Sequence, residues 1–280
     1  MNLPVFACDE VILRALKEDI SYIDVTTDYM IGEEERAAAV FRAKAEGVLC
    51  GLEIALRVFE LLGGLETVEI FRRDGERLQP GDRIARIGGR TRTLLKGERT
   101  ALNLLQHLSG IASATARAVA LTAGTRAQIT DTRKTLPGLR ALQKYAVVTG
   151  GGRNHRFNLS DAAMLKDNHI DAAGSISRAV SLLRGKVGHT VKIEVETRTL
   201  DEVDEALAAG ADIIMLDNMD CAAMKEAVGR IGGRVPAEAS GGITEETLRA
   251  AAETGVDIIS IGALTHSVKA LDISMKIEKA

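Results

Sequence analysis

The chain has 280 residues, more than one small core needs, and this length predicts a large α/β domain with a smaller companion. A formal net charge of −3 argues against a general nucleic-acid binder, so its basic clusters are interpreted as a local site for a small ligand. The three cysteines form no C-x-x-C motif, and neither a signal peptide nor an apolar run of about 18 residues is found. We therefore expect a cytoplasmic protein without disulfides or a membrane partner.

The first hundred residues predict a small α+β sandwich domain. Segments 37–52, 66–78 and 82–89 are typical of strands joined by Gly- and Pro-containing turns, with a helix at about 53–62. Residues 96–123 predict a helix that links two domains and breaks near Ser109-Gly110. We place the N-terminal domain at 1–110 and the catalytic domain at 111–266.

The central block, 131–170, concentrates cationic side chains where strands would end and loops begin. Its turn Gly150-Gly151-Gly152 lacks the lysine and the spacing of a P-loop and is structural when considered alone. Arg140 and Lys144 lie at helical spacing and are expected on a solvated helix face rather than in the site. The remaining cations predict a pocket for a small polyanion: Arg133, Lys134, His155, Arg156 and Lys166.

The second half alternates short apolar runs with helical patterns. The runs rich in Val and Ile, as expected of strands buried on both faces, are 191–197, 211–218, 233–240 and 256–264, and two further candidates are 127–134 and 162–168. Helices are predicted between them at 200–210, 221–231 and 244–255, with left-handed caps at Gly210 and Gly255 and a capping box at Thr199 and Glu202. The repeat predicts parallel βα units, hence a (β/α) barrel or an open doubly wound sheet.

The polar residues at the strand ends favour the barrel. A barrel directs the carboxyl end of every strand into one mouth, whereas a doubly wound sheet concentrates its site at one switch point. Nearly every predicted strand here ends in charged or polar side chains or in glycines that can contact a ligand: Thr132 to Lys134, Lys166, Glu196, Asp217, Ser240-Gly241-Gly242 and Gly262. We predict an incomplete TIM-like (β/α) barrel with the smaller N-terminal domain attached.

The motifs that carry these residues resemble those of the quinolinate phosphoribosyltransferases, the carboxylating nicotinate-nucleotide pyrophosphorylases of NAD biosynthesis (the NadC family). The resemblance covers nearly the whole chain, and the matching phrases occur in the family's order. They are GERTALN with HLSGIAS, DTRKT, GGG-x-NHR, KDNH, EVE with LDN, EASGGIT and GALTHSVKALDISMKI. A set of phrases in order is far more specific than any one of them.

The resemblance implies transfer of a phosphoribosyl group from phosphoribosyl pyrophosphate to quinolinate, with decarboxylation. Arg133, His155 and Arg156 would hold the quinolinate carboxylates, with Lys134 and Lys166 between quinolinate and the donor. Glu196 and Asp217 would hold Mg²⁺ and stabilise charge on the ribose. Ser240, Gly241, Gly242 and Gly262 would bind the donor's 5′-phosphate, with Thr132 also at the site. Lys134, Lys166, Glu196 and Asp217 form the expected catalytic set.

The resemblance also implies an assembly. Arg99 would reach the active site of a neighbouring subunit, which makes a homodimer part of the site, within a hexamer if dimers assemble further. The last segment, about 267–280, would return to the N-terminal domain as a strand.

Several alternatives remain open at this level. A nicotinate phosphoribosyltransferase of related fold would recognise only one carboxylate, and the molybdenum-transport-associated ModD proteins share much of this sequence. Glu194 lies two residues before Glu196 on the same side of the predicted strand, one layer deeper, and is an alternative to it. His169 either orients Asn168 or is structural.

Overall fold

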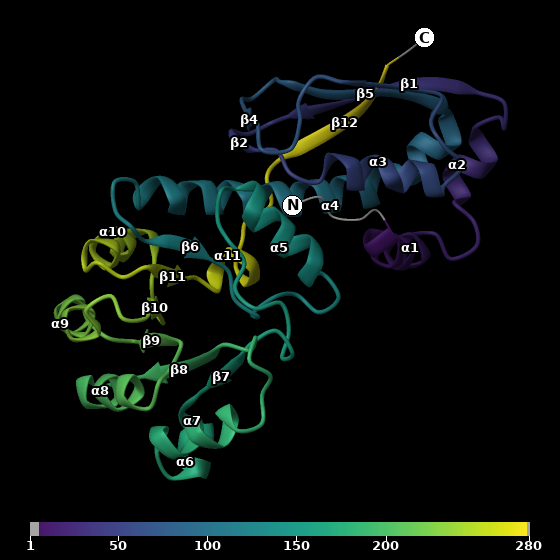
Figure 1. Ribbon diagram of the computed structural model, residues 1–280. Coiled ribbons are helices and arrows are strands. Elements are labelled where there is room, and N and C mark those ends of the chain that lie inside the picture. The colour runs from purple at the N-terminus through teal and green to yellow at the C-terminus, as the bar shows by residue number, and fades with distance from the viewer. Residues whose placement is uncertain (1–5, 279–280) are drawn as a thin grey trace. The chain divides into compact units, whose positions relative to one another are not determined.

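The computed structural model describes residues 6–278, and the chain folds into two compact units (Figure 1). The first unit comprises Met1–Ala116, Thr135–Gly151 and Leu264–Ala280, and the second comprises Arg117–Lys134 and Gly152–Ala263. In this division residues 111–116, 135–151 and 264–266 group with the first unit, whereas the sequence analysis placed them in the catalytic domain. The chain therefore crosses between the units several times.

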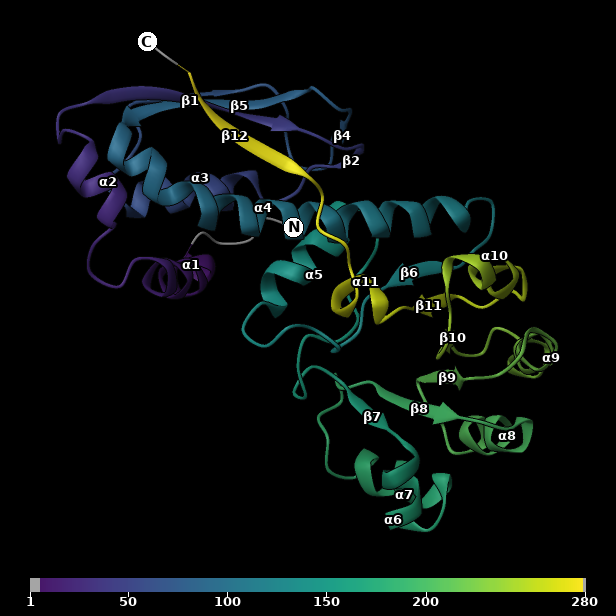
Figure 2. The ribbon, with the colours of Figure 1, turned by 180° about the vertical axis from the view of Figure 1, so that it is seen from behind.

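The first unit is built on an antiparallel sheet with the order β12-β1-β5-β3 (Figure 2). The last strand, β12, pairs with β1 over six residues, from Ala38 opposite Glu278 to Ala43 opposite Ile273. A separate two-stranded ladder joins β2 and β4. The bounds are β1 (Arg36–Ala43), β2 (Gly47–Val48), β3 (Thr67–Ile70), β4 (Arg77–Leu78), β5 (Arg83–Arg90) and β12 (Ile273–Glu278).

The helices of the first unit begin with α1 (Phe6–Asp19), α2 (Val25–Met30) and α3 (Leu52–Leu61). The core of this unit includes the edge-to-face pair Phe41 and Phe59, whose ring centroids lie 6.2 Å apart, together with Leu105 and Ile111. The last two residues belong to α4 (Thr91–Leu121), which starts in the first unit and ends in the second. The α+β character expected of this part of the chain is confirmed.

The predicted break in α4 is wrong. The helix runs without interruption through Ser109 and Gly110. A Cβ atom on Gly110 would lie 2.3 Å from the carbonyl oxygen of Lys269, so this glycine allows another segment to pack against the helix. The close approach of another backbone, rather than a helix end, explains why position 110 is a glycine.

The prediction that Lys144 lies on a solvated helix face is also wrong. It belongs to α5 (Arg140–Thr149) and has no exposed surface, whereas Arg140 is partly exposed and donates to the Thr135 hydroxyl. Two positions after this helix require glycine for structural reasons. A side chain at Gly150 would clash with the Ala112 carbonyl, and Gly151 has a φ of +91°.

The second unit is a parallel sheet with the order β6-β11-β10-β9-β8-β7. Strands β7 to β11 lie side by side in chain order, and β6, the first along the chain, pairs with β11, the last. Contact between first and last strands is typical of a barrel, and the sheet ends at β6 and β7, which leaves the barrel incomplete. The bounds are β6 (Gln128–Thr130), β7 (Ala163–Leu165), β8 (Ile193–Thr197), β9 (Ile213–Asp217), β10 (Ala237–Ser240) and β11 (Ile258–Ser260).

Helices follow the strands of this unit, as the repeat predicted. They are α6 (Asp167–Ala173), α7 (Ile176–Arg184), α8 (Leu200–Ala208), α9 (Cys221–Ile231), α10 (Glu245–Glu253) and the short α11 (Ala263–His266). Gly210 and Gly255 take the expected left-handed conformation, with φ of +79° and +91°. Thr199 caps α8 by accepting from the Glu202 amide, but the Glu202 carboxylate accepts from Arg198 instead of completing a capping box.

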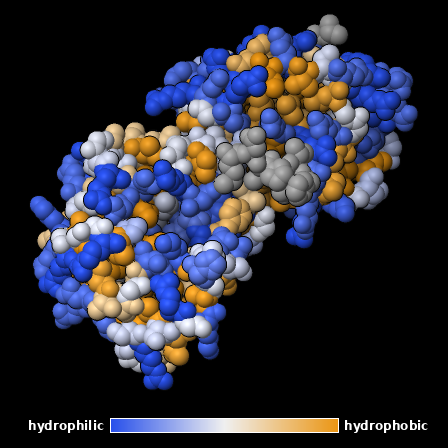
Figure 3. Space-filling model, viewed as in Figure 1, coloured by the Kyte–Doolittle hydropathy of each residue, from blue (hydrophilic) through white to orange (hydrophobic). Residues whose placement is uncertain are grey.

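The surface seen in Figure 3 mixes hydrophilic and hydrophobic residues over both units. Within residues 6–278, no helix is both long and apolar enough to cross a bilayer.

Candidate active site

The carboxyl ends of the parallel strands surround a cavity of about 600 Å³ that lies wholly within the second unit. Each strand supplies side chains because residues that alternate along a strand point to the same face, and the last inward position of each strand reaches the mouth. The lining residues are Thr132, Arg133, Lys134, His155, Arg156, Met164, Lys166, Glu196, Met215, Asp217, Asn218, Ser240, Gly241, Gly242 and Ser260.

A buried carboxylate holds the loop that carries His155 and Arg156 beside the end of β6. Asp131 has no exposed surface, and its two oxygens accept from Asn154 Nδ2 (2.6 Å) and from the His155 amide (2.9 Å). A parallel bridge between Thr130 and Arg153 extends the sheet into this loop. The first residue of the DTRKT phrase is thus structural, and it brings the cations of two segments together.

Two arginines crowd one side of the cavity. Burial lowers the pKa of Arg156, and the nearby Arg133 lowers it further, while Glu194 and Asp161 oppose the shift. The Arg156 guanidinium also donates to the Ala162 carbonyl oxygen at 3.0 Å. Positive groups this close together repel one another, and a bound polyanion would relieve that repulsion.

Lys166 and Glu196 form an ion pair in the lining of the same cavity. Lys166 Nζ lies 3.0 Å from Glu196 Oε2, and the glutamate side chain is largely buried. The next helix begins after Lys166, whose amide donates to His169 Nδ1 at 3.1 Å. His169 therefore supports the backbone at Lys166.

Asn218 follows β9 in a left-handed conformation, with a φ of +53° that only glycine adopts freely. Its Nδ2 donates to Asp217 Oδ2 at 2.7 Å, which fixes the aspartate carboxylate at the rim of the cavity. A Cβ on Gly241 would lie 2.4 Å from Asn218 Oδ1, so the turn after β10 needs a glycine at this position. Strained backbone of this kind is typical of functional sites.

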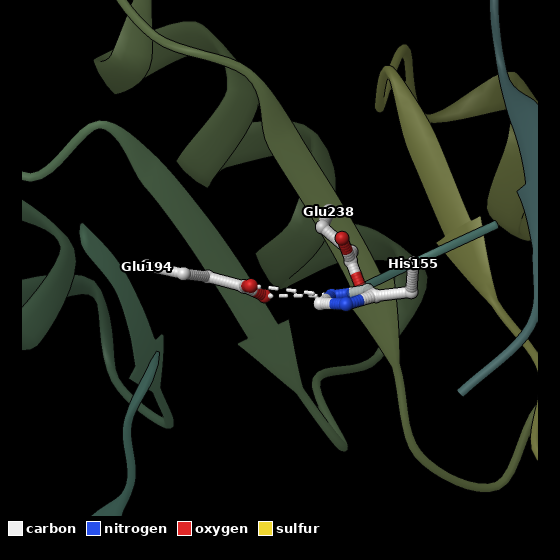
Figure 4. Close-up of side chains that lie close together, drawn as sticks. All are labelled: His155, Glu194 and Glu238. Atoms are coloured by element: carbon white, nitrogen blue, oxygen red, sulfur yellow. Dashed lines mark hydrogen bonds and ion pairs between the residues drawn. The ribbon is translucent and has the colours of Figure 1, made fainter. Parts of the chain in front are cut away.

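A buried acidic pair lies beneath His155 (Figure 4). His155 Nε2 is 3.2 Å from Glu194 Oε2 and 3.5 Å from Glu238 Oε1, and both glutamates are about 1% exposed. Burial lowers the pKa of His155 and the hydrogen bonds and charges of the two carboxylates raise it, whereas the Arg156 amide, which donates to Nδ1, opposes a second proton on the ring. Burial also raises the pKa of Glu194. The Arg156 amide donates to His155 Nδ1 at 2.7 Å, which favours a lone pair on that nitrogen.

The cavity brings together all but two of the residues singled out from the sequence. The exceptions are Gly262, which lies two residues beyond β11, and Arg99, which is exposed on α4 in the first unit. Glu196 lines the cavity, whereas Glu194 lies one layer deeper against His155.

Four lining residues were not assigned to the site from the sequence, although Asn218 was noted at a strand end beside Asp217: Met164, Met215, Asn218 and Ser260. The two methionines and Ser260 occupy inward strand positions, and that alternation was available from the sequence. The Ser260 hydroxyl is buried and has no hydrogen-bond partner among the described residues. A buried polar atom without a partner in a cavity wall is suited to a ligand.

Glu196 and Asp217 are the carboxylates that line the cavity, and their oxygens are the ligand type that Mg²⁺ prefers. The residues thus fit this ion in donor chemistry. A second candidate group, His155 with Glu194 and Glu238, brings one ligand atom from each residue within 4.8 Å of the others.

Known proteins resemble this chain along nearly its full length. Residues 24–109 match the N-terminal domain of quinolinate phosphoribosyl transferase, and residues 111–276 match its C-terminal domain. The probable nicotinate-nucleotide pyrophosphorylase [carboxylating] of Bacillus subtilis is 47% identical over 93% of this chain and 90% of that protein. The chloroplastic enzyme of Arabidopsis thaliana is 42% identical over 98% of this chain and 84% of that protein.

Solved structures agree with these sequence matches. NadC from Streptococcus pyogenes is 45% identical, with a TM-score of 0.95 over 99% of this chain and 98% of that one. The enzyme from Francisella tularensis is 38% identical, with a TM-score of 0.94 over 99% and 98%. Human nicotinic acid phosphoribosyltransferase, at 13% identity and a TM-score of 0.61, shares the fold. The chain belongs to the quinolinate phosphoribosyltransferase family.

Proposed function

We propose that the cavity of the second unit is where this chain carries out the activity of its family. That activity is nicotinate-nucleotide pyrophosphorylase (carboxylating), which converts quinolinate to nicotinate mononucleotide. The observation that carries the proposal is the lining itself, which brings four cations and two carboxylates into one cavity: Arg133, Lys134, Arg156 and Lys166 with Glu196 and Asp217. Quinolinate is a dianion and phosphoribosyl pyrophosphate carries several more charges, so an enclosed site needs such clustered cations.

Quinolinate would bind against the arginines. A guanidinium offers a planar fork that matches a carboxylate, and the lining contains Arg156 together with Arg133, which is close enough to lower the pKa of Arg156. His155 lines the same part of the cavity and holds the Arg156 main chain. Lys134 and Lys166 would act as compact charges between quinolinate and the pyrophosphate of the donor.

The ribosyl donor would bind toward the carboxylates. Loss of pyrophosphate develops positive charge on the ribose, and a nearby carboxylate stabilises that charge. The position of Glu196 and Asp217 in the cavity lining, at the ends of adjacent strands, supports this role. They would also hold Mg²⁺, which when bound neutralises phosphate charge and orients the donor.

The donor's 5′-phosphate would bind at the turn Ser240-Gly241-Gly242. Both glycines have positive φ, of +87° and +61°, and glycine allows a backbone to approach a ligand closely. Gly262, just beyond β11, would complete this subsite, with Thr132, which follows the neighbouring strand β6.

The reaction needs no protein nucleophile. The pyridine nitrogen attacks the anomeric carbon of the ribose as pyrophosphate leaves, and the ring nitrogen becomes positively charged. The C–C bond to the adjacent carboxylate then breaks, CO₂ leaves, and its electron pair stays on a ring carbon beside that nitrogen. A proton from solvent completes nicotinate mononucleotide.

We also propose a homodimer, with Arg99 of one subunit completing the cavity of the other. Arg99 is exposed in the first unit, and that unit also exposes four apolar side chains around α2: Tyr22, Val25, Tyr29 and Met30, at 65–92%. An exposed apolar group of this kind is typical of a protein interface. Further assembly to a hexamer and a cytoplasmic location stay predictions, the latter favoured by the free thiols of Cys8, Cys50 and Cys221.

The decisive assay supplies purified protein with quinolinate, phosphoribosyl pyrophosphate and Mg²⁺ and follows nicotinate mononucleotide and CO₂ together, with nicotinate as a parallel substrate. We expect equal amounts of both products from quinolinate and little product from nicotinate. Product from nicotinate alone would favour the nicotinate enzymes, and no product from either would favour a role like that of the ModD proteins.

A further inference from the structure

Glu194 and Glu238, the two carboxylates that face His155, have no part in the reaction as described above. The two carboxylates come from β8 and β10, and both face the ring nitrogen Nε2 (Figure 4). They lie below the cavity rather than in its lining, and each is about 1% exposed. Burying two carboxylates is costly unless they bind a donor or a cation, so this arrangement needs an explanation.

A metal ion is one explanation, and the geometry argues against it. A histidine that binds a metal through Nε2 donates its Nδ1 proton to an oxygen acceptor. Here Nδ1 faces a hydrogen-bond donor instead of an acceptor, because it accepts from the Arg156 amide at 2.7 Å. A metal on Nε2 would therefore require a fully deprotonated ring, which is disfavoured at neutral pH.

The same contact fixes the tautomer of the neutral ring. Since Nδ1 provides a lone pair to the Arg156 amide, the ring proton lies on Nε2 and points between Glu194 and Glu238. Both ring nitrogens thus have protein partners. The ring is then suited to hold the protein chain in place rather than to donate to quinolinate directly.

We propose that Glu194 and Glu238 are positioning residues that hold His155 with its proton on Nε2, so that Nδ1 fixes the main chain at Arg156 and places the guanidinium for quinolinate. The proposal rests on the proposed function. Glu194 also offsets the repulsion between Arg133 and Arg156, because its charge opposes the effect of Arg133 on Arg156. The cavity can then keep its cations close together before the dianion arrives.

Four variants test the proposal by steady-state kinetics: Glu194→Ala, Glu194→Gln, Glu238→Ala and Glu238→Gln. Each alanine removes an acceptor for the Nε2 proton, and we expect the KM for quinolinate to rise about ten- to a hundredfold while the KM for phosphoribosyl pyrophosphate stays within about twofold. Glutamine keeps an acceptor oxygen, so it should restore most of the quinolinate affinity. Glu253→Gln, on the exposed face of α10, is the matched control and should leave both KM values unchanged.

Two kinetic outcomes would overturn the proposal. If the carboxylates acted only through their charge, neutral glutamine would make the cavity more positive and lower the KM for quinolinate. If they were only structural, the KM values for both substrates would rise together, with glutamine no better than alanine.

The histidine tautomer gives a readout that does not depend on activity. In ¹⁵N-labelled protein, with His155→Gln to assign the signals, we expect Nε2 to carry the proton and Nδ1 to be bare at pH 7, and Glu194→Ala to abolish that fixed pattern. A proton on Nδ1, or stoichiometric Zn²⁺ bound at Nε2, would contradict the proposal. Lack of quinolinate turnover by the unmodified protein would instead count against the proposed function and leave the tautomer result standing.

Discussion

The two ends of the parallel sheet use the same residue types for different purposes. At the amino end, Asp212 accepts from the Ile193 amide (2.8 Å) and pairs with Arg184 (2.8 Å), and Asp257 accepts from the Ala237 amide (2.9 Å) and pairs with Arg126. At the carboxyl end, Asp217 and Glu196 share a cavity with four cations, two of which repel each other. Charges that satisfy one another stabilise the sheet, whereas charges that crowd around a cavity are arranged for a ligand.

The largest effect is expected at the carboxyl end of β9. Asp217→Asn keeps the shape of the side chain but removes the charge proposed to stabilise the ribose and Mg²⁺, so kcat should fall about a hundred- to a thousandfold. Quinolinate binding, measured by calorimetry, should change little. Asp212→Asn, at the other end of the same strand, is the matched control and should keep its kcat. An equal loss of turnover and quinolinate binding in Asp217→Asn would undermine the assignment.

Arg99 lies in the first unit, outside the barrel, and is proposed to act in the cavity of the neighbouring subunit. Arg99→Ala and Lys134→Ala should each be nearly inactive. When the two variants are mixed in equal amounts, about half of the dimers should contain one subunit of each kind, and each such heterodimer would have one intact site. The mixture should therefore recover about a quarter of the activity of the unmodified protein. The measurement is activity after the two variants are unfolded and refolded together. Absence of recovery, with heterodimers present by mass spectrometry, would contradict a shared site.

The turn after β10 should tolerate no side chain at Gly241. A methyl group there would displace Asn218. Because a displacement of catalytic groups by about 1 Å lowers the rate about a hundredfold, Gly241→Ala should lower kcat/KM about ten- to a hundredfold. Gly210→Ala is the control because Gly210 has a similar φ of +79° but open space around its Cβ position. It should lose stability only, and loss of activity in both variants would indicate backbone strain rather than contact with Asn218.

Removal of the charge network at the amino end should affect stability rather than catalysis. Asp212→Ala leaves the Ile193 amide and Arg184 without their acceptor, so the free energy of unfolding should fall by about 1–3 kcal/mol. Urea denaturation measures that change, and kcat of the folded variant should be unaltered. A lowered kcat with unchanged stability would reverse the roles assigned to the two ends.

The smallest effect concerns pH. Partial burial would raise the pKa of Asp212, but hydrogen bonds from the Ile193 amide and Arg184 outweigh it and hold the pKa below its ordinary value. The charged form therefore stabilises the fold above the unfolded pKa of about 4, and this contribution is lost as pH falls through the folded pKa. The difference in unfolding free energy between the unmodified protein and Asp212→Ala should shrink below about pH 4. A constant difference down to pH 2 would contradict this.

The sequence predicted most of the second unit because its signals are local. Apolar runs ending in polar residues located all six strands, and those ends predicted the cavity, although the strands are shorter than the runs. Two errors in the first unit, at Gly110 and Lys144, arose where packing against distant segments decides the outcome. The pair beneath His155 was likewise missed, because its members come from separate segments and only the folded sheet brings them together.

The pairing of β12 with β1 has a consequence for synthesis. The paired residues Ala43 of β1 and Ile273 of β12 are 230 positions apart in the sequence, and the chain between them includes the whole barrel. While the protein is being made, β1 has no partner on that side and presents an open strand edge, which invites pairing with other chains. Completion of the first unit must therefore wait until β12 has left the ribosome, so interrupted synthesis or C-terminal cleavage before Ile273 should yield chains prone to aggregate.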